Sequence, residues 1–286
     1  MRFKFIAILL VSLAAVSFGQ RGSDDSRHIR VMTFNIRYNE PRDGVNAWPN
    51  RKQKVADVIR FHKADLVGMQ EAQIGQLEDL EKLLPAFAWC GVGRTDGKRD
   101  GEFSAILYLK DRFKLIECKT FWLSETPDKP GSKGWDAAYP RIVTSAKLRD
   151  RRTGKTFFHF NTHFDHVGTK ARFESAKMII GRIHNASGGT QSILTGDLNV
   201  TEDTEAYKTL TAPGSGLKDA RYISRNGHFG GTSTFNAFKE MQPGRKIDFI
   251  FGTPGITVFE HGVLSDNWDG LWASDHLPVL AEIGLR

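Results

Sequence analysis

The stretch SILTGDLNV, residues 192–200, begins as a buried β-strand and ends in polar residues. Ile193, Leu194 and Thr195 favour extended structure and run straight into Gly-Asp-Leu-Asn. Residues i and i+2 of an extended segment point to the same side, so Asp197 and Asn199 are predicted to project together. They would leave the C-terminal edge of the strand, which is where α/β sheets usually hold their ligands.

Short runs rich in Phe, Ile, Val and Thr recur along the chain and predict a sheet protein with few helices. The predicted strands are residues 28–37, 66–71, 104–110, 113–123, 142–148, 156–164, 192–200, 246–252 and 276–285. Apolar residues at helical spacing predict helices near 51–63, 74–84 and 173–183. Between residues 87 and 164 the turns are too short for helical crossovers, so those strands should pair antiparallel. A parallel doubly wound sheet is the alternative, but the pattern favours one α/β (α+β) domain, a four-layer helix–sheet–sheet–helix sandwich with two packed mixed β-sheets.

The first residues have the anatomy of a signal peptide. Arg2 and Lys4 precede an apolar run over residues 5–16, which is too short for a membrane span, and small residues follow it. We therefore expect residues 1–19 to be a signal peptide, 20–27 a flexible segment and 28–286 one domain. The exported protein would reach the periplasm or the exterior, with no transmembrane segment in the mature chain.

The two cysteines, Cys90 and Cys118, lie at the ends of neighbouring strand-like segments. A disulfide between them is open in an exported protein, but we expect two buried free thiols. The formal net charge of +7 suits an anionic substrate. That charge is spread along the chain, without the Lys/Arg block of a nucleic-acid-binding arm.

Polar residues follow strand after strand in this sequence. They are Asn35, Glu71, Asn161, His163, Asp197, Asn199, Asp248, Asp275 and His276. Repetition at strand ends predicts one site at a rim of the sheets, assembled from distant parts of the chain. Glu, Asp and Asn oxygens suit Mg²⁺ or Mn²⁺, and no pattern of soft zinc ligands competes. No GxSxG, Walker loop or GxGxxG is present either.

Seven motifs carry a family resemblance. In order they are TFNIR, VGMQE, GEFSAILY, NTHFDH, TGDLN, KIDFIF and SDHLPV. Together they resemble the signature of the endonuclease/exonuclease/phosphatase (deoxyribonuclease I-like) superfamily of metal-dependent phosphoesterases, over about residues 29–284. The segment FWLSETPDKPGSKGWDAAYPRIVT, residues 121–144, further resembles an exported bacterial subgroup. The resemblance implies the four-layer sandwich and makes residues 28–286 the catalytic domain.

The resemblance also implies a metal site with Mg²⁺ (or Mn²⁺) as cofactor. Glu71 would be the principal metal ligand, Asn35 would lie beside it, and Asp275 would complete the shell directly or through water. Asp197 and Asn199 would orient the attacking water and contact the scissile phosphate.

Two histidines complete the implied acid–base set. His276 is similar to the family's base or phosphate stabiliser, with Asp248 fixing its tautomer. His163 resembles a second histidine of the deoxyribonuclease-like branches. Paired with Glu102, it would be an imidazolium that protonates the leaving oxygen. The sequence leaves open whether Asp197 or His276 takes the proton of the water.

Four further residues are predicted to contact the substrate: Arg141, Asn161, Asp165 and Trp135. Arg141 would bind a phosphate in two-point fashion or form a surface ion pair, and Trp135 would line the cleft or plug a loop. The predicted activity is hydrolysis of a phosphodiester, with nucleic acid, a phospholipid or a small diester as candidate substrates. A phosphomonoesterase and a catalytically silent binding module are the alternatives. No stable protein partner is implied, and a monomer is the default.

Overall fold

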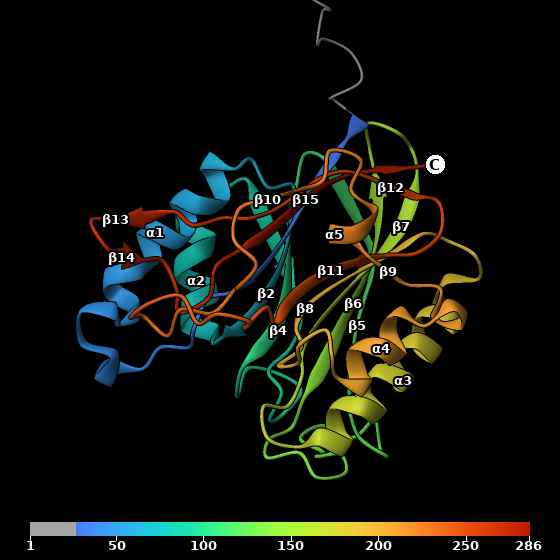
Figure 1. Ribbon diagram of the computed structural model, residues 1–286, viewed down its shortest axis with the longest axis horizontal. Helices are drawn as coiled ribbons and strands as arrows, with labels where there is room; N and C mark the ends of the chain where they lie inside the picture. Colours follow the sequence, from blue (N-terminus) through green and yellow to red (C-terminus); the bar gives the residue numbers. More distant parts are fainter. Residues whose placement is uncertain (1–26) are drawn as a thin grey trace, which may run out of the picture.

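Two β-sheets packed face to face form the centre of the molecule, and helices cover their outer faces (Figure 1). The computed structural model describes residues 27–286. The predicted signal peptide and almost all of the 20–27 segment lie outside these residues. Within residues 27–286, no helix is long and apolar enough to cross a membrane.

The first sheet of the described chain has seven strands in the order β10-β12-β15-β1-β2-β4-β3. Their bounds, in that order, are His228–Phe229, Ile256–Val263, Val279–Leu285, Ile29–Asn35, Leu66–Ala72, Phe103–Leu109 and Phe87–Cys90. β1 and β2 run parallel, because the helix between them carries the chain back to the same end. The other neighbouring pairs are antiparallel, except β10 with β12.

The second sheet has six strands within residues 27–286, in the order β5-β6-β7-β8-β11-β9. Their bounds are Phe113–Trp122, Ile142–Asp150, Thr156–His163, Ser192–Asp197, Asp248–Gly252 and Lys218–Asp219. Only β7 and β8 are parallel, again with a helix between them. The short strands β13 (Asn267–Trp268) and β14 (Leu271–Trp272) pair with each other apart from both sheets.

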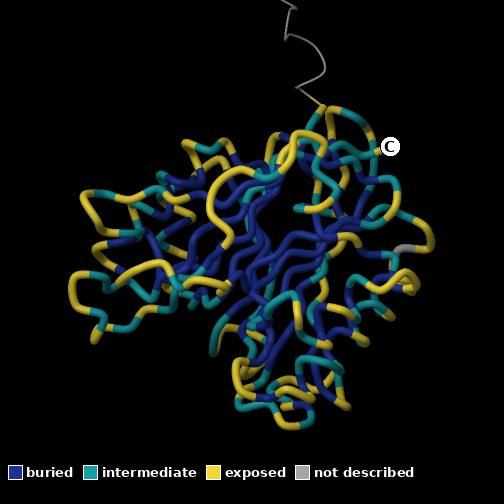
Figure 2. The backbone as a smooth tube through the Cα atoms, viewed as in Figure 1, coloured by how far each residue is buried: buried dark blue, intermediate teal, exposed yellow. Residues whose placement is uncertain are grey.

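The helices divide between the two outer faces. Helices α1 (Trp48–Phe61) and α2 (Ile74–Leu83) pack on the seven-stranded sheet through residues such as Val55, Ile59 and Leu77. Helices α3 (Thr169–Ser187) and α4 (Glu205–Thr211) pack on the other sheet, and the short α5 (Ala220–Ile223) follows β9. A third apolar cluster fills the space between the sheets, so burial is concentrated in the middle of the molecule (Figure 2).

This arrangement confirms the predicted sandwich and excludes a single doubly wound sheet. The pairs β3–β4, β5–β6 and β6–β7 are antiparallel, as expected for short connections. β4 and β5 are consecutive but do not pair, because the chain crosses there from one sheet to the other.

The two sheets also meet through polar side chains close to one rim. Asn161 on β7 donates to the backbone carbonyls of Met69 and Ala105, both at 2.9 Å. Its oxygen accepts from Gln70 Nε2 at 2.7 Å and Thr195 Oγ1 at 3.0 Å. Every donor and acceptor position of this buried amide is therefore used.

Gly68 on β2 makes this approach of the sheets feasible. A Cβ at this position would lie 2.0 Å from Oγ1 of Thr195 and 2.6 Å from Oδ1 of Asn161. Only a residue without a side chain fits there.

The expectation of two free thiols is wrong, because Cys90 and Cys118 form a disulfide. Cys90 ends β3 and Cys118 lies in β5, which are edge strands of different sheets. The sequence showed two strand-like segments but not that the chain changes sheets between them. The disulfide therefore fastens the two sheets together along one side of the sandwich.

Replacing both cysteines by serine is expected to lower the free energy of unfolding by about 3 kcal/mol, because the bond closes a loop in the unfolded chain. Chemical denaturation with urea measures this change. The wild-type protein unfolded in a reductant should show the same lower midpoint. An unchanged midpoint in the double variant would contradict a stabilising role.

Asn161→Ala is expected to lower the free energy of unfolding by about 3 kcal/mol or more, since it leaves several buried groups without partners. Thr162→Val is the matched control. Thr162 is equally buried on β7 but makes one side-chain hydrogen bond, to the carbonyl of Ile142, so its loss should cost about 1 kcal/mol. Equal losses of unfolding free energy in the two variants would show that the hydrogen bonds of Asn161 between the sheets stabilise the fold no more than a single buried hydrogen bond does.

Candidate active site

Most of the predicted polar residues line one cavity of about 520 Å³ at a rim of the sandwich, whereas Asn35, Asn161 and Asp248 are absent from its described lining. Its floor lies at the C-terminal ends of β1, β2, β7 and β8, and the loop after β14 closes one side. A second cavity, of about 470 Å³, lies beside β12 and β15 and contains none of the predicted site residues. The candidate catalytic residues therefore lie at the first cavity.

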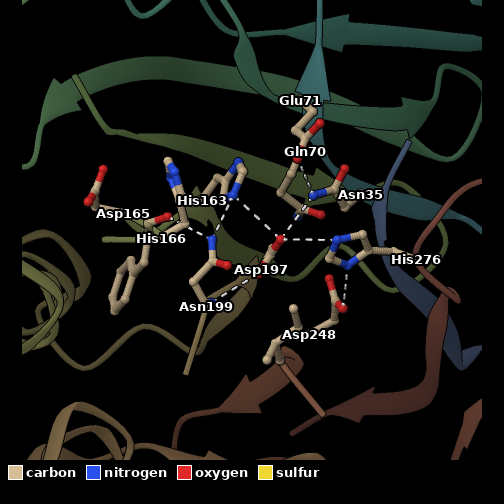
Figure 3. Close-up of polar contacts among 12 residues, drawn as sticks. Asn35, Gln70, Glu71, His163, Asp165, His166, Asp197, Asn199, Asp248 and His276 are labelled. Atoms are coloured by element: carbon tan, nitrogen blue, oxygen red, sulfur yellow. Dashed lines mark hydrogen bonds and ion pairs between the residues drawn. The ribbon is translucent and has the colours of Figure 1, made fainter. Parts of the chain in front are cut away.

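Asp197 lies at the centre of the site (Figure 3). Its side chain is almost fully buried at the end of β8. Oδ2 accepts from Nδ2 of Asn35 at 2.9 Å, and it lies 3.5 Å from Nε2 of His163 and 3.7 Å from Nε2 of His276. Oδ1 accepts from the backbone N–H of Asn199 at 3.0 Å.

His276 and Asp248 form a buried pair beside Asp197. Nδ1 of His276 lies 2.9 Å from Oδ2 of Asp248. Asp248 begins β11 and faces Asp197 across the antiparallel pairing with β8, which places both acids next to one imidazole. Burial alone would lower the pKa of His276, but Asp248 and then Asp197 raise it well above its usual value. Burial, followed by the charge of Asp248, raises the pKa of Asp197 to about 7.

Glu71 is held in the site by an unusual backbone conformation. The β2–β4 register shifts between Met69 and Ala72, and Glu71 has a φ of 62°. A non-glycine residue in the left-handed region is strained, and such strain is concentrated at functional sites. The carboxylate then accepts from Nδ2 of Asn35 at 3.0 Å and from the backbone N–H of Tyr38 at 3.1 Å.

Asn35 lies beside Glu71, as the resemblance implied. Its Oδ1 accepts from the backbone N–H of Arg37 at 2.9 Å, which fixes the orientation of the amide. The nitrogen therefore faces the site and bridges Glu71 and Asp197. Through this nitrogen Asn35 positions two carboxylates.

His163 differs from the predicted imidazolium. Burial lowers its pKa well below the usual value, and the cations Arg141 and Arg94 lower it further. The Nδ2 of Asn199 donates to Nε2 of His163 at 2.9 Å and to the carbonyl of Phe164 at 3.0 Å. Because Nε2 accepts this hydrogen bond, it holds no proton for a leaving oxygen. A neutral His163 instead fixes the amide of Asn199.

Glu102 is only loosely associated with His163. Its Oε2 lies 3.9 Å from Nδ1 of His163, and among residues 27–286 that nitrogen has no hydrogen-bond partner. The carboxylate forms a two-point ion pair with Arg94, at 2.7 and 2.8 Å. Glu102 therefore lies within ion-pair distance of His163, as predicted, but its two hydrogen bonds go to Arg94.

The acidic groups fit a hard divalent cation. Ligand atoms of Glu71, Asp197 and His276 lie within 4.8 Å of one another. Asp275 lines the same cavity; burial raises its pKa and the charge of Glu71 raises it further, against the lowering effect of His276. Burial and a neighbouring carboxylate raise the pKa of both Asp197 and Asp275, and a cation would offset the negative charge of these acids. Since His276 is held by Asp248, the oxygens of Glu71 and Asp197 are the better donors, with Asp275 close by.

The predicted substrate contacts separate into two groups. Arg141 lines the cavity, 4 % exposed, with Nε at 3.4 Å from Asp165 and Nη2 at 3.1 Å from Nδ1 of His166. Asp165 is buried beside it; burial raises its pKa, but backbone N–H groups, that of Gly168 first, lower it to about 2. Asn161 lies between the sheets with all its atoms bonded, and Trp135 is absent from the described lining of the cavity. The structure therefore does not place Asp165, Asn161 or Trp135 as substrate contacts.

Several cavity residues were missed by the sequence interpretation. They are Arg37, Tyr38, Gln73, Arg94, Tyr139, His166, Phe235, Arg245 and Ile247. Most lie in loops that carry no periodic pattern. Sequence signals were available for four of them: the motifs TFNIR, NTHFDH and KIDFIF contain Arg37, His166 and Ile247, and in AAYPRIVT Tyr139 stands two residues before Arg141.

The fold and the cluster of acids and histidines at its rim define a class of phosphoester hydrolases. The chain belongs to the endonuclease/exonuclease/phosphatase family, whose family model matches residues 32–276.

Solved structures agree with this assignment. An endonuclease/exonuclease/phosphatase from Bacteroides vulgatus is 42 % identical, with a TM-score of 0.87 over 91 % of this chain and 99 % of that one. A mannosyl-6-phosphatase from Bacteroides thetaiotaomicron is 36 % identical, with a TM-score of 0.83 over 89 % of this chain and 99 % of that one. An uncharacterized protein of Acanthamoeba polyphaga mimivirus is 24 % identical over 72 % of this chain, which spans only 35 % of that protein.

The hydrogen bond between His163 and Asn199 predicts that the two residues act as one unit in catalysis. His163→Ala and Asn199→Ala should each lower kcat/KM for a phosphate ester by roughly 100-fold. The double variant should lose little more than the worse single variant, because each mutation already removes the shared contact. Losses that multiply would instead support an independent acid role for His163. Unfolding midpoints of the three variants control for loss of structure.

Proposed function

We propose that this protein hydrolyses phosphate esters with the help of a divalent metal ion, Mg²⁺ or Mn²⁺. The observation that carries the proposal is the position of Asp197, which touches Asn35 and lies between two histidines beside Glu71. Structural residues do not need such a concentration of strained and titratable groups, whereas phosphoryl transfer does.

The residues of the site have separable tasks in this mechanism. Asp197, whose pKa is near neutrality, accepts a proton from the attacking water. The charged His276, held by Asp248, stabilises negative charge on the phosphoryl oxygens. Asn199, fixed by His163, holds the phosphate in place. Glu71, with Asp275 close by, would hold the cation, which when bound neutralises phosphate charge.

The shape and charge of the cavity narrow the class of ester that we propose as the substrate. The sequence favoured a phosphodiester, with nucleic acid or phospholipid among the substrates. The cavity of about 520 Å³ is small for a polymer, and four arginines line it: Arg37, Arg94, Arg141 and Arg245. These features favour a compact, highly anionic ester, and the similarity to a mannosyl-6-phosphatase supports the same choice. A sugar phosphomonoester is therefore our preferred substrate class, and a small diester is the second candidate.

We also infer that the protein is exported to the periplasm or the exterior. The signal-like residues 1–19 and the disulfide between Cys90 and Cys118 support this inference, since disulfides persist in oxidising compartments. Cell fractionation with an antibody against the protein tests it. Recovery from the cytoplasm alone would contradict it.

Hydrolysis is expected to require Mg²⁺ or Mn²⁺ and to stop in excess chelator. A panel of mannose 6-phosphate, p-nitrophenyl phosphate and bis-p-nitrophenyl phosphate should show the highest kcat/KM on the first. Asp197→Asn should lower kcat by roughly 1,000-fold, because it removes the base. Asp203→Asn, at an exposed aspartate outside the cavity, is the matched control. Full activity in chelator, or unchanged turnover by Asp197→Asn, would refute the mechanism.

A further inference from the structure

One wall of the catalytic cavity is a continuous set of interlocked side chains that the mechanism above does not use. It consists of Arg94, Tyr139, Arg141 and His166, which we call the loop wall. The loop after β3 contributes Arg94, the segment before β6 contributes Tyr139 and Arg141, and the loop after β7 contributes His166.

Each member of the loop wall contacts the next. Nη2 of Arg141 lies 3.1 Å from Nδ1 of His166, and the rings of His166 and Tyr139 are stacked at 5.8 Å with 20° between their planes. The guanidinium of Arg94 lies 5.2 Å from the centre of the Tyr139 ring. Arg94 is itself held by its two-point pair with Glu102. Cation–π and stacking contacts therefore keep the exposed members in place.

Asp165 fastens this wall to the body of the protein. Its Oδ2 accepts from the backbone N–H of Tyr139 at 3.3 Å and from Nε of Arg141 at 3.4 Å. Its Oδ1 accepts from the backbone N–H groups of Val167 and Gly168. One buried carboxylate thus positions two of the three loops, so the wall is formed before any substrate binds. A preformed surface of this kind contributes specificity at low entropic cost.

The exposure of the loop wall rises from the floor of the cavity to its mouth. Arg141 is 4 % exposed, whereas Tyr139 is 50 % exposed. A phosphate held by Asn199 on the floor must direct the rest of its ester toward the mouth. That part of the substrate then passes along Tyr139 and His166, which offer polar edges and aromatic surface rather than an apolar slot.

We propose that the loop wall is the subsite for the leaving group, and that Tyr139 makes it selective for a polar ring such as a sugar. This proposal rests on the proposed phosphoesterase function. Residues Arg94 and Arg141 set the charge of the subsite, and Tyr139 supplies the ring contact. A small acyclic leaving group is too short to use it.

Tyr139→Ala is expected to lower the selectivity for a ring ester, measured as kcat/KM on mannose 6-phosphate divided by kcat/KM on glycerol phosphate, by at least roughly ten-fold. The change should lie mainly in KM for the sugar ester. Tyr222→Ala is the matched control, since Tyr222 is 63 % exposed and lies outside the cavity. A parallel calorimetric titration with mannose 6-phosphate measures binding without reliance on turnover.

The outcomes separate the two proposals. Hydrolysis of both esters with unchanged selectivity in Tyr139→Ala overturns the loop wall and leaves the phosphoesterase function in place. An equal loss on both esters also overturns it, because Tyr139 would then act on the phosphate site. Absence of hydrolysis refutes the function, yet binding that weakens at least five-fold in Tyr139→Ala alone would still support the subsite. If the esters are neither hydrolysed nor bound, both proposals are overturned.

Discussion

The buried amide of Asn161 fixes how the two sheets of this protein lie against each other. It is bonded to β2 and β4 of one sheet and to β8 of its own, close below the cavity floor. Glu71 follows Gln70 on β2, and His163 follows Asn161 by two residues on β7. A sliding movement between the sheets would therefore separate Glu71 from Asp197 at once. Apolar packing between the layers is non-directional, whereas four hydrogen bonds on one side chain allow one register only.

The rigid packing of the two sheets holds strained backbone conformations at the floor of the cavity. Arg37, Glu71 and Asn199 all have positive φ values, between 49° and 62°. Each such residue costs of order 1–3 kcal/mol, and the surrounding packing must offset that cost. The backbone turns at these points aim Glu71 and Asn199 into the cavity instead of along their strands. At these residues the backbone conformation that the site requires therefore lowers the stability of the fold.

The sequence predicted the parts of the site that are local and failed where distant segments decide the chemistry. Asp197 and Asp248 stand at strand ends and His276 lies shortly before β15, so their approach followed from strand order and motif. The pKa of His163 is lowered first by burial and then by Arg141 and Arg94, which come from other loops, and no local pattern reports these contacts. Asn35 was placed correctly, but only its contact with the Arg37 backbone shows which end of the amide faces the acids. The disulfide was missed for a similar reason, since strand adjacency in sequence does not reveal a change of sheet.

The pairing of β8 with β11 has a consequence for how this protein can vary. Asp197 and Asp248 face each other in the ladder although fifty residues separate them along the chain. The register of two short strands fixes the relative position of the two acids. This position does not depend on the length of the chain segment that connects β8 to β11. Insertions, deletions or new loops close to Phe235 and Arg245 can therefore reshape the mouth while the acid pair stays in place. Such a division allows new substrates to be acquired by changing the loops around an unchanged reaction centre.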